Sequence, residues 1–517
     1  MRVIARLDVK GPNVVKGVQF EALRVMGQPA DLAREYFLQG ADELLYIDIV
    51  ASLYRRENLL HVVREAAKGI FIPFTAGGGV RTLKDIRDLL LAGAEKVAIN
   101  TAAVKNPSFI TEAAQRFGSQ CIVLSIEAKR KGDSWEAYTD NGREATGLDV
   151  VEWARKGELL GAGEILLTSV DREGTKRGLD VELIKKVSTA VSVSVIASGG
   201  ASSPVEIAGT VVGSGADAVA IASLLHYGTT RVVEIKDVLA TAGASVRPCT
   251  ETERAHLART ADEADVVDYN RFTLRQFSDS IGIENAPHDE LELFQTPPEK
   301  ADVVIIDYGI NNVRSVGMAC ESFGTKVSIA HSPEAIRAAK RLILPGVGAF
   351  GDGMHALREK GFIGPLLEQI KRGTPFFGIC LGMQLLFSQS EEFGLHEGLG
   401  VIEGKVVMFP DPREVRVSGY HLPHIGWDAI HPPAGSPERW RQSVLAHTRP
   451  GTYAYFVHSL YGVPADGSDV LAVSSYGGID FCAALQHKNI TATQFHPEKS
   501  GMMGLALLRR FCEQRAA

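Results

Sequence analysis

The chain of 517 residues is poor in cysteine, and its six cysteines lack the paired spacing of a zinc site or a disulfide framework. It also lacks a basic excess: its net charge of −7 argues against a dominant nucleic-acid or acidic-membrane partner. No uncharged apolar run reaches the length of a membrane span, and charges interrupt the first ten residues, so no signal peptide is expected. These absences predict a cytoplasmic protein with no bound metal and no cofactor.

The first 248 residues alternate short β-branched runs with amphipathic stretches. The runs are VIARLDV, ELLYIDIV, IPFTAGG, KVAINT, CIVLSIEA, EILLTSVD, VSVIASGG and AVAIAS. Eight strands separated by helices predict a closed parallel (β/α)8 barrel over residues 1–248. Because 517 residues are too many for one hydrophobic core, at least one further domain is expected.

An internal repeat supports the barrel. ELLYID, which begins at Glu43, returns as EILLTS at Glu164, 121 residues later, and Gly78 returns as Gly199 at the same offset. The matching offsets predict two half-barrels of four strand–helix units each.

The alternating pattern stops at about residue 249. Residues 249–300 are first charged and alanine-rich and then acidic with prolines, which predicts a linker with one surface helix. A new strand pattern, ADVVIIDYG, opens at residue 301. Residues 301–517 mix strand–helix units with β-rich stretches, and we predict a second α/β domain there.

The segment FFGICLGMQLLF, residues 376–387, places Cys380 between Gly378 and Gly382 where a strand runs into a helix. Glycines permit close backbone approach or a positive φ at such a corner, which lifts the middle side chain above the sheet edge. A lone cysteine is more often a buried apolar residue. However, His496 in TQFHPEKSG can serve as its base, and Glu498 can fix the imidazole tautomer, so the sequence predicts a Cys-His-Glu catalytic set.

GICLGMQL, followed after 116 residues by QFHPEKS, resembles the class I glutamine amidotransferases, and the resemblance covers nearly all of residues 301–517. It implies hydrolysis of glutamine to glutamate and ammonia through a thioester on Cys380. LPGVGAF is similar to the family's oxyanion loop. The residues implied to meet the oxyanion are Gly346, Val347, Gly348 and Leu381, and those implied to contact glutamine are Gln384, His458 and Ser459.

Acidic residues stand at the carboxyl ends of several predicted barrel strands, where barrel enzymes place their chemistry. Asp8 ends the first strand and Glu127 the fifth. Because these two lie 119 residues apart, close to the repeat period, we expect them on opposite sides of the barrel mouth. Two opposed carboxyl groups can divide acid and base work on one substrate.

Glycine motifs related by the repeat predict two phosphate cradles, and hence an elongated substrate with a phosphate at each end. One cradle combines AGGGV with INT, and the other combines DREGT with ASGGA. The candidate residues are Asp48, Gly78, Gly79, Asn100 and Thr101 on one side, and Asp171, Gly174, Ser198, Gly199 and Gly200 on the other.

LDVKGPNVVKG, NTAAV, TSVDREGTKRG and IASGGA resemble the cyclase subunit of imidazole glycerol phosphate synthase across residues 1–248, and LPHIGWD and DYGINNVRSV resemble the glutaminase of the same enzyme. The resemblance implies that ammonia attacks a bisphosphorylated formimino-aminoimidazole carboxamide ribonucleotide. The products would be imidazole glycerol phosphate and an aminoimidazole carboxamide ribotide, which feed histidine and purine synthesis. Asp8 and the residue at position 127 are the implied catalysts, and Lys16 is implied to lie near a substrate phosphate.

Position 127 departs from the family pattern. The family's usual residue in S-I-x-A-K-R is aspartate, whereas this chain reads SIEAKR. Glu127 keeps the acid but adds a methylene, which moves the carboxyl group by roughly an ångström, and a shift of that size can cost about a hundredfold in rate.

Four charged residues stand at or just before predicted strand beginnings, and therefore at the opposite end of the barrel from the mouth: Arg2, Glu43, Lys96 and Glu164. One interpretation is a charged rim that solubilises this end. The resemblance implies instead a salt-bridged ring that gates ammonia arriving from the glutaminase. Fusion would raise the effective concentration of the partner domain to roughly millimolar, and pairing within one chain or between two stays open.

Other functions remain open. A sugar-phosphate isomerase barrel with a glutaminase appendage would also fit a half-barrel repeat. A related amidotransferase could deliver ammonia to a different phosphorylated or nucleotide-sugar acceptor, which Glu127 favours. A non-catalytic scaffold is disfavoured by the intact Cys380, His496 and Glu498. In HLPHIGWD, the sequence suggests no acidic or Cys/His partners for His421 and His424, so a surface or interdomain segment is favoured over a metal site.

Overall fold

The computed structural model describes residues 1–49, 57–260, 294–309, 312–415, 417, 419–434 and 436–514. The chain forms two compact units. The first comprises Met1–Ala258 with Pro410–Trp427 and Val457–Ser459, and the second comprises Arg259–Phe409, Asp428–Phe456 and Leu460–Ala517. Most of the predicted linker, residues 261–293, lies outside the described residues, and its first part forms helix α11 (Glu251–Thr260).

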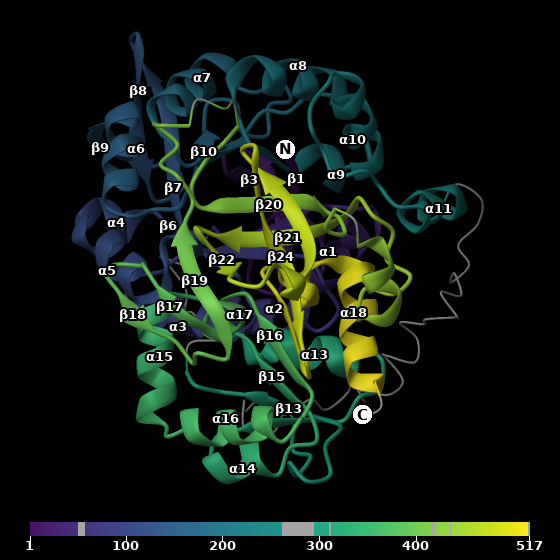
Figure 1. Ribbon diagram of the computed structural model, residues 1–517. Coiled ribbons are helices and arrows are strands. Elements are labelled where there is room, and N and C mark those ends of the chain that lie inside the picture. Colours follow the sequence, from purple (N-terminus) through teal and green to yellow (C-terminus); the bar gives the residue numbers. More distant parts are fainter. Residues whose placement is uncertain are drawn as a thin grey trace. The chain divides into compact units, whose positions relative to one another are not determined.

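Eight parallel strands form a closed barrel in the first unit, as the sequence predicts. Figure 1 draws these strands in purple, blue and teal. They are β1 (Arg2–Lys10), β4 (Glu43–Asp48), β5 (Phe74–Gly77), β6 (Lys96–Ile99), β7 (Ile122–Lys131), β10 (Glu164–Ser169), β11 (Ser194–Ser198) and β12 (Ala218–Ile221). Neighbours follow the order β10-β11-β12-β1-β4-β5-β6-β7, and pairing of β10 with β7 closes the ring. In this order β1 and β7 are separated by three strands on either side, so they lie opposite each other.

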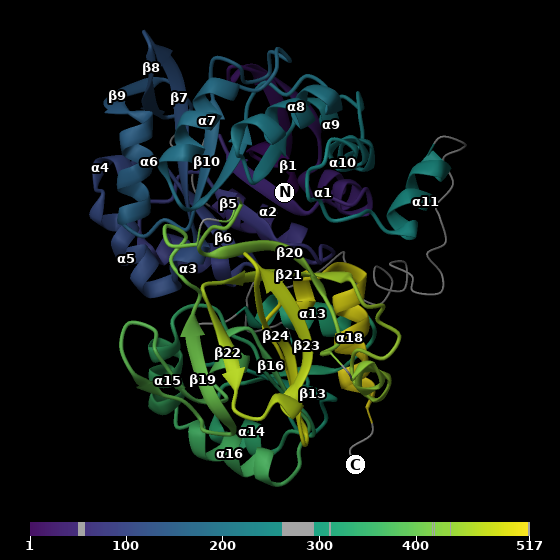
Figure 2. The same ribbon diagram turned by 45° about the horizontal axis from the view of Figure 1, so that its top comes forward.

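Helices surround these strands (Figure 2). The longer ones are α1 (Pro29–Leu38), α2 (Glu57–Ala67), α3 (Leu83–Leu91), α5 (Ser108–Phe117), α6 (Val150–Leu159), α7 (Val181–Ala190), α8 (Pro204–Ser214) and α10 (Val232–Thr241), and two short ones are α4 (Thr101–Lys105) and α9 (Ser223–His226). Several begin at a side-chain cap: Asp149 accepts from the backbone of α6, Asp180 from that of α7 and Ser203 from that of α8.

The repeat extends further than the sequence motifs indicate. A hairpin of β2 (Asn13–Val18) and β3 (Glu21–Gly27) follows β1, and a second of β8 (Ser134–Thr139) and β9 (Glu144–Asp149) follows β7. The first strands of the two hairpins begin 121 residues apart, which is the repeat offset. Each hairpin therefore extends the chain beyond the mouth end of one of the two opposed strands.

The barrel strands are apolar because both of their faces are covered. Residues from several strands, among them Ile4, Leu45, Val123, Leu166 and Ile196, form one buried cluster. Burying each such side chain stabilises the fold by about 1.5–3 kcal/mol. Charged side chains occupy the two ends of this apolar interior, where the candidate sites lie.

The second unit is built on a mixed seven-stranded sheet in the order β14-β13-β15-β16-β25-β24-β23. The strands are β13 (Val303–Ile306), β14 (Val327–Ala330), β15 (Leu342–Leu344), β16 (Phe376–Ile379), β23 (Val470–Tyr476), β24 (Ile479–His487) and β25 (Ile490–Thr493). The first five in the order are parallel and the last two antiparallel. This mixed α/β domain confirms the predicted fold class.

Helices and smaller sheets complete the domain (Figure 1). The helices are α13 (Val313–Glu321), α14 (Pro333–Arg337), α15 (Phe350–Glu359), α16 (Ile363–Lys371), α17 (Leu381–Gln384) and α18 (Gly501–Glu513). A four-stranded sheet holds β18 (His396–Glu397), β17 (Phe387–Ser390), β19 (Ile402–Met408) and β22 (Leu460–Pro464), and a two-stranded sheet holds β20 (His424–Ile430) and β21 (Thr452–His458). None of the described helices is both long enough and apolar enough to span a membrane.

Candidate active sites

Cys380 occupies the sharp corner between β16 and α17 and is only 6% exposed. Its backbone has φ of 51° and ψ of −107°, a conformation that non-glycine residues rarely adopt and that costs about 1–3 kcal/mol. The Cys380 backbone N–H donates to the carbonyl of Thr493, at 2.7 Å, and so ties the corner to the neighbouring strand β25. Strain at one cysteine, held by its surroundings, is typical of a nucleophile.

The two flanking glycines are needed for close packing. A Cβ atom on Gly382 would lie 1.8 Å from the carbonyl oxygen of Leu344, and one on Gly378 would lie 3.0 Å from the carbonyl oxygen of Gly382. The residue with a positive φ at this corner is Cys380 itself and not either of the two glycines. Of the two reasons that the sequence suggests for these glycines, close backbone approach is the one that applies.

His496 and Glu498 form a buried pair immediately after β25. Nδ1 of His496 lies 2.7 Å from Oε1 of Glu498, and the His496 backbone N–H donates to the carbonyl of Tyr455 at 3.0 Å. Burial disfavours the imidazolium, but Glu498 and Cys380 outweigh it and raise the pKa of His496 well above its ordinary value. Nε2 of His496 makes no hydrogen bond among the described residues. The ring is therefore oriented by Glu498 with Nε2 available for proton transfer.

The predicted oxyanion loop follows β15 and lies against the start of α17. A Cβ atom on Gly346 would lie 2.2 Å from the Tyr308 hydroxyl and 2.8 Å from Cβ of Leu381. Gly348 has φ of 108°, which also favours glycine. The loop of Gly346, Val347 and Gly348 is thus brought beside the residue that follows Cys380.

The residues implied to bind glutamine have other partners here. The amide nitrogen of Gln384 donates to the carbonyl of Leu460 at 3.0 Å and to Oε1 of Gln494 at 3.1 Å. Nε2 of His458 lies 3.1 Å from Nδ1 of His424. Ser459 follows His458 directly, between β21 and β22.

The expectation that His421 and His424 have no acidic or histidine partners is wrong. His421 forms an ion pair with Asp217 at 3.0 Å, and His424 contacts His458. These partners lie between 34 and 204 residues away, so local sequence could not show them. No group of three His, Cys, Asp or Glu side chains in the described part of the chain is placed to hold a metal.

The four charges predicted at the base of the barrel form a closed ring, and each is the first residue of its strand. Arg2 pairs with Glu43 at 2.8 Å and with Glu164, and Lys96 pairs with Glu43 at 2.8 Å and with Glu164 at 2.5 Å. Burial raises the pKa of Glu164, but Arg2 and Lys96 outweigh it and lower the value to about 2. All four side chains are buried, so a solvated charged rim is excluded.

The barrel mouth holds a second buried charge cluster around Asp8. Oδ1 of Asp8 accepts from Nε of Arg6 at 2.8 Å, and Oδ2 accepts from Lys16 at 3.0 Å. Lys16 also pairs with Glu173. Burial alone would raise the pKa of Asp8, but Arg6 and Lys16 outweigh it and hold the pKa well below the ordinary value. Asp8 is therefore a carboxylate at any physiological pH.

Glu127 faces a different environment on the opposed strand β7. Its Oε2 accepts the backbone N–H of Gly142 at 2.7 Å, and no ion pair joins it to a cation among the described residues. Burial raises the pKa of Glu127 to about 7, against the lowering effects of the Gly142 hydrogen bond and of Arg6. The pKa values of the two opposed carboxyl groups are thus shifted in opposite directions, which is the arrangement expected of an acid and a base.

The repeat-related glycines meet the same physical need in both halves of the barrel. Gly78 has φ of 106°, and a Cβ atom there would lie 2.3 Å from the carbonyl oxygen of Asp48. Gly199 has φ of 95°, and its Cβ would lie 2.6 Å from the carbonyl oxygen of Ser169. Each glycine lets the backbone pass close to the end of the preceding strand.

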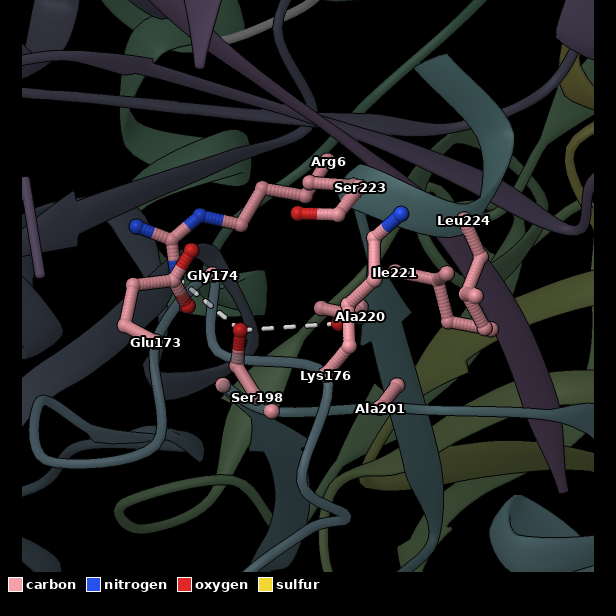
Figure 3. Close-up of a pocket in the computed structure, with 13 residues that line it drawn as sticks. Arg6, Glu173, Gly174, Lys176, Ser198, Ala201, Ala220, Ile221, Ser223 and Leu224 are labelled. Carbon is pink, nitrogen blue, oxygen red and sulfur yellow. Dashed lines mark hydrogen bonds between the residues drawn. The ribbon is translucent and has the colours of Figure 1, made fainter. Parts of the chain in front are cut away.

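Two cavities at the mouth contain the predicted cradles. One is lined by Asp48, Gly78, Gly79, Asn100, Thr101 and Glu127, among others. The other is lined by Arg6, Glu173, Gly174, Lys176, Ser198, Gly199, Gly200 and their neighbours (Figure 3). Asp171 lines neither: its side chain accepts from the backbone N–H of Arg130 at 2.7 Å. Lys16, which the resemblance places near a substrate phosphate, forms ion pairs with Asp8 and Glu173.

Arg6 and Glu173 were missed by sequence reasoning. Nη1 of Arg6 donates to Thr168 at 3.0 Å and to Ser198 at 2.9 Å, so its guanidinium reaches from β1 to β10 and β11 across the mouth. The signal available for Arg6 was its place two residues before Asp8, on the same face of the strand. Glu173 lies within DREGT but offers no such pattern.

Comparison with known proteins agrees with this geometry. Residues 2–231 match the family model "Histidine biosynthesis protein", and residues 304–514 match "Glutamine amidotransferase class-I". An imidazole glycerol phosphate synthase subunit HisF of Legionella pneumophila is 62% identical over 201 residues, which are 39% of this chain and 95% of that protein. The HisF subunit of Myxococcus xanthus (strain DK1622) is 52% identical over 249 residues, which are 48% of this chain and 98% of that protein.

The fold and the two sites thus define a chain in which a histidine-biosynthesis barrel is joined to a class I glutamine amidotransferase domain. The chain belongs to the family of the imidazole glycerol phosphate synthase subunit HisF, and the second domain is additional to the length of those relatives. Both resemblances drawn from the sequence motifs are confirmed.

The packing at Cys380 predicts that Gly382→Ala destabilises the second domain. The added Cβ would overlap the Leu344 carbonyl, which is backbone and cannot move aside cheaply. We expect a loss of about 3 kcal/mol or more, measured as a lower unfolding temperature of that domain by calorimetry on the full chain.

Gly364→Ala is the matched control. Gly364 lies in α16, and a Cβ atom there would have no neighbour within 4 Å, so the substitution should be neutral or slightly stabilising. Equal stability of the two variants would contradict the packing argument.

The environment of Glu127 predicts a pH dependence of stability that Glu127→Gln removes. The folded pKa of about 7 lies above the ordinary 4.5, so the folded state binds this proton more tightly. The stabilisation that this proton gives the folded state is complete below about pH 4.5 and is lost as the pH rises through 7. Between pH 5 and pH 8 the wild type should lose about 1–3 kcal/mol more unfolding free energy than Glu127→Gln. Denaturant titrations of both proteins measure this, and parallel pH profiles would refute it.

Proposed function

We propose that the chain is a glutamine-dependent imidazole glycerol phosphate synthase. Glutamine would be hydrolysed in the second domain, and the ammonia would react in the barrel with a bisphosphorylated formimino-aminoimidazole carboxamide ribonucleotide. The products would be glutamate, imidazole glycerol phosphate and an aminoimidazole carboxamide ribotide. The observation that carries the proposal is the presence, in one chain, of the Cys380, His496 and Glu498 arrangement and of two opposed barrel carboxyl groups with pKa values shifted in opposite directions.

In the glutaminase step, the Cys380 thiol gives its proton to Nε2 of His496, and the sulfur attacks the side-chain amide carbon of glutamine. The oxyanion that develops would be met by backbone N–H groups of the loop from Gly346 to Gly348 and of Leu381. His496 then protonates the leaving ammonia. Water, deprotonated by the same imidazole, hydrolyses the thioester to glutamate, while Glu498 holds the ring tautomer throughout.

In the cyclase step, the phosphates of the acceptor would lie in the two repeat-related cradles, which places its reacting centre between Asp8 and Glu127. Asp8 stays ionised and is therefore assigned the base role, although it is a weak base while its ion pairs with Arg6 and Lys16 persist. Glu127 is available in both forms near neutral pH and is suited to donate one. The carboxyl group of Glu127 accepts a hydrogen bond from the backbone N–H of Gly142.

We infer that ammonia enters the barrel through the ring of Arg2, Glu43, Lys96 and Glu164. Ammonia released into bulk water at neutral pH would be protonated and lost as a nucleophile, so a sheltered path is needed. Lys96 contacts both glutamates of the ring, and movement of this one side chain would interrupt both of its ion pairs.

A second candidate is transfer of ammonia to another phosphorylated or nucleotide-sugar acceptor. Two features of the mouth keep it open: Glu127 in place of aspartate, and the Arg6 guanidinium beside Asp8, which places a positive charge in the lining of the acceptor site. No feature of the described barrel residues specifically supports the isomerase alternative.

The glutaminase assignment predicts that Cys380→Ala abolishes glutamine-dependent synthesis and spares synthesis from ammonium. The nucleophile is lost, whereas the barrel site is in the other domain. Purified wild type and variant would be given the bisphosphorylated ribonucleotide with glutamine or with an ammonium salt, and imidazole glycerol phosphate would be quantified.

Wild-type turnover with both nitrogen sources would support the synthase and show that glutamate serves at position 127. Glutamine hydrolysis without either synthesis would point to the other acceptor class. Full glutamine-dependent turnover in Cys380→Ala would refute the role of Cys380.

The ring predicts that Lys96→Met uncouples the two reactions. The ratio of imidazole glycerol phosphate to glutamate should fall several-fold, while ammonium-dependent turnover changes little. Loss of a buried cation also destabilises the barrel, by about 3–5 kcal/mol. Lys236→Met is the matched control, because Lys236 is a buried cation paired with Asp42 outside the ring. An unchanged product ratio in Lys96→Met would rule out the gate.

A further inference from the structure

Gln494 is a fully buried residue that none of the catalytic assignments uses. It follows β25 directly and lies two residues before His496. Its backbone N–H donates to the carbonyl of Ala483 at 2.9 Å, which fixes the chain against β24. Its side-chain nitrogen donates to Sγ of Cys380 at 3.6 Å, a normal distance for a hydrogen bond to sulfur.

A chain of two amides determines which end of Gln494 faces the sulfur. The carbonyl of Leu460 can only accept, so the nitrogen of Gln384 must be turned toward it. The second hydrogen of that nitrogen points to Gln494 and requires an acceptor there, which is Oε1 at 3.1 Å. With Oε1 committed, the NH₂ group of Gln494 is the end presented to Sγ. A backbone carbonyl thus orients a donor toward the nucleophile through two buried side chains.

We propose that Gln494 is a further catalytic residue of the glutaminase site, which stabilises the Cys380 thiolate by donating a hydrogen bond to its sulfur. The proposal rests on the glutaminase function proposed above. When the thiol proton passes to Nε2 of His496, the negative charge stays on Sγ, and an N–H already directed at that atom is worth more to the anion than to the neutral thiol. Gln494 therefore favours the charged, nucleophilic form.

This role complements that of His496. The imidazole takes the proton, whereas Gln494 donates a hydrogen bond to the sulfur that the proton leaves. Gln494 holds the sulfur, while Glu498 orients the ring that carries the proton to a leaving group. The contact of Gln494 with Sγ limits the rotation of the Cys380 side chain, which keeps Sγ at the position from which it attacks.

Alkylation of Cys380 by iodoacetamide tests the proposal without glutamine. Gln494→Met keeps the length of the side chain and removes the N–H donor. At pH 7 we expect the alkylation rate to fall about tenfold to a hundredfold, the range for hydrogen bonds to charged groups. The kcat of glutamine hydrolysis should fall to a similar extent, with a smaller change in KM. Raising the pH should restore most of the alkylation rate, which a merely structural defect would not allow.

Further variants separate chemistry from folding. Gln494→Glu presents a carboxylate to the sulfur and should slow alkylation at least as much as Gln494→Met. Gln384→Met removes the amide that orients Gln494 and should give a smaller decrease. Gln369→Leu is the matched control, because Gln369 is also a buried amide, and its side chain bonds to Ile336, Arg337 and Thr374 rather than to Cys380. It should leave the alkylation rate unchanged.

Wild-type alkylation rates in both Gln494→Met and Gln494→Glu would overturn the proposal. So would a loss that high pH does not restore, or one that Gln369→Leu reproduces. If the wild type hydrolyses no glutamine but the Gln494 variants still slow alkylation, the proposed glutaminase function fails while the thiolate contact stands.

Discussion

Compensation of buried charge is the constraint on which the barrel depends. Moving one ion out of water costs several kcal/mol unless a partner and further hydrogen bonds replace the water. At the base, Glu43 and Glu164 are each held by two cations, and at the mouth Asp8 is held by two more. Among the described residues no cation pairs with Glu127, and burial raises its pKa to about 7, so it meets the same constraint by being partly protonated near neutral pH. The difference between the two mouth carboxyl groups is therefore a result of how the barrel satisfies its buried charges.

In the second domain, the corresponding constraint is the backbone conformation of Cys380. Cys380 keeps an unfavourable φ because Gly382 packs against the Leu344 carbonyl and the Cys380 N–H is fixed to β25. The residues after β25 then supply both His496 and Gln494. One strand end thus holds the corner and is followed by the side chains to which we assign the chemistry, so the register of β25 helps to set the geometry of the candidate site.

The fold could be predicted, and Cys380, His496 and Glu498 could be proposed as a catalytic set, because the signals for them are local or periodic. Strand–helix alternation, the 121-residue offset and the glycines around Cys380 are visible in single segments. The partners of His421 and His424, the Arg6 bonds to Thr168 and Ser198, and the contact of Gln494 with Cys380 were not predictable. Nearly all of these contacts join side chains more than 100 residues apart, and nothing in either local segment specifies them. The place of Glu173 in the site was not predictable for the same reason, because its partner Lys16 lies in a distant segment of the chain.

In both charge clusters of the barrel, the two halves of the barrel contribute opposite net charges. The first half of the barrel contributes three charged residues to each cluster, and their charges sum to +1: Arg2, Glu43 and Lys96 at the base, and Arg6, Asp8 and Lys16 at the mouth. The second half contributes one glutamate to each cluster, Glu164 at the base and Glu173 at the mouth. Either half alone would leave a unit charge at each end without its counterion, and two copies of the same half would place like charges together. The halves repeat in backbone but are complementary in charge, so each is the electrostatic partner that the other requires.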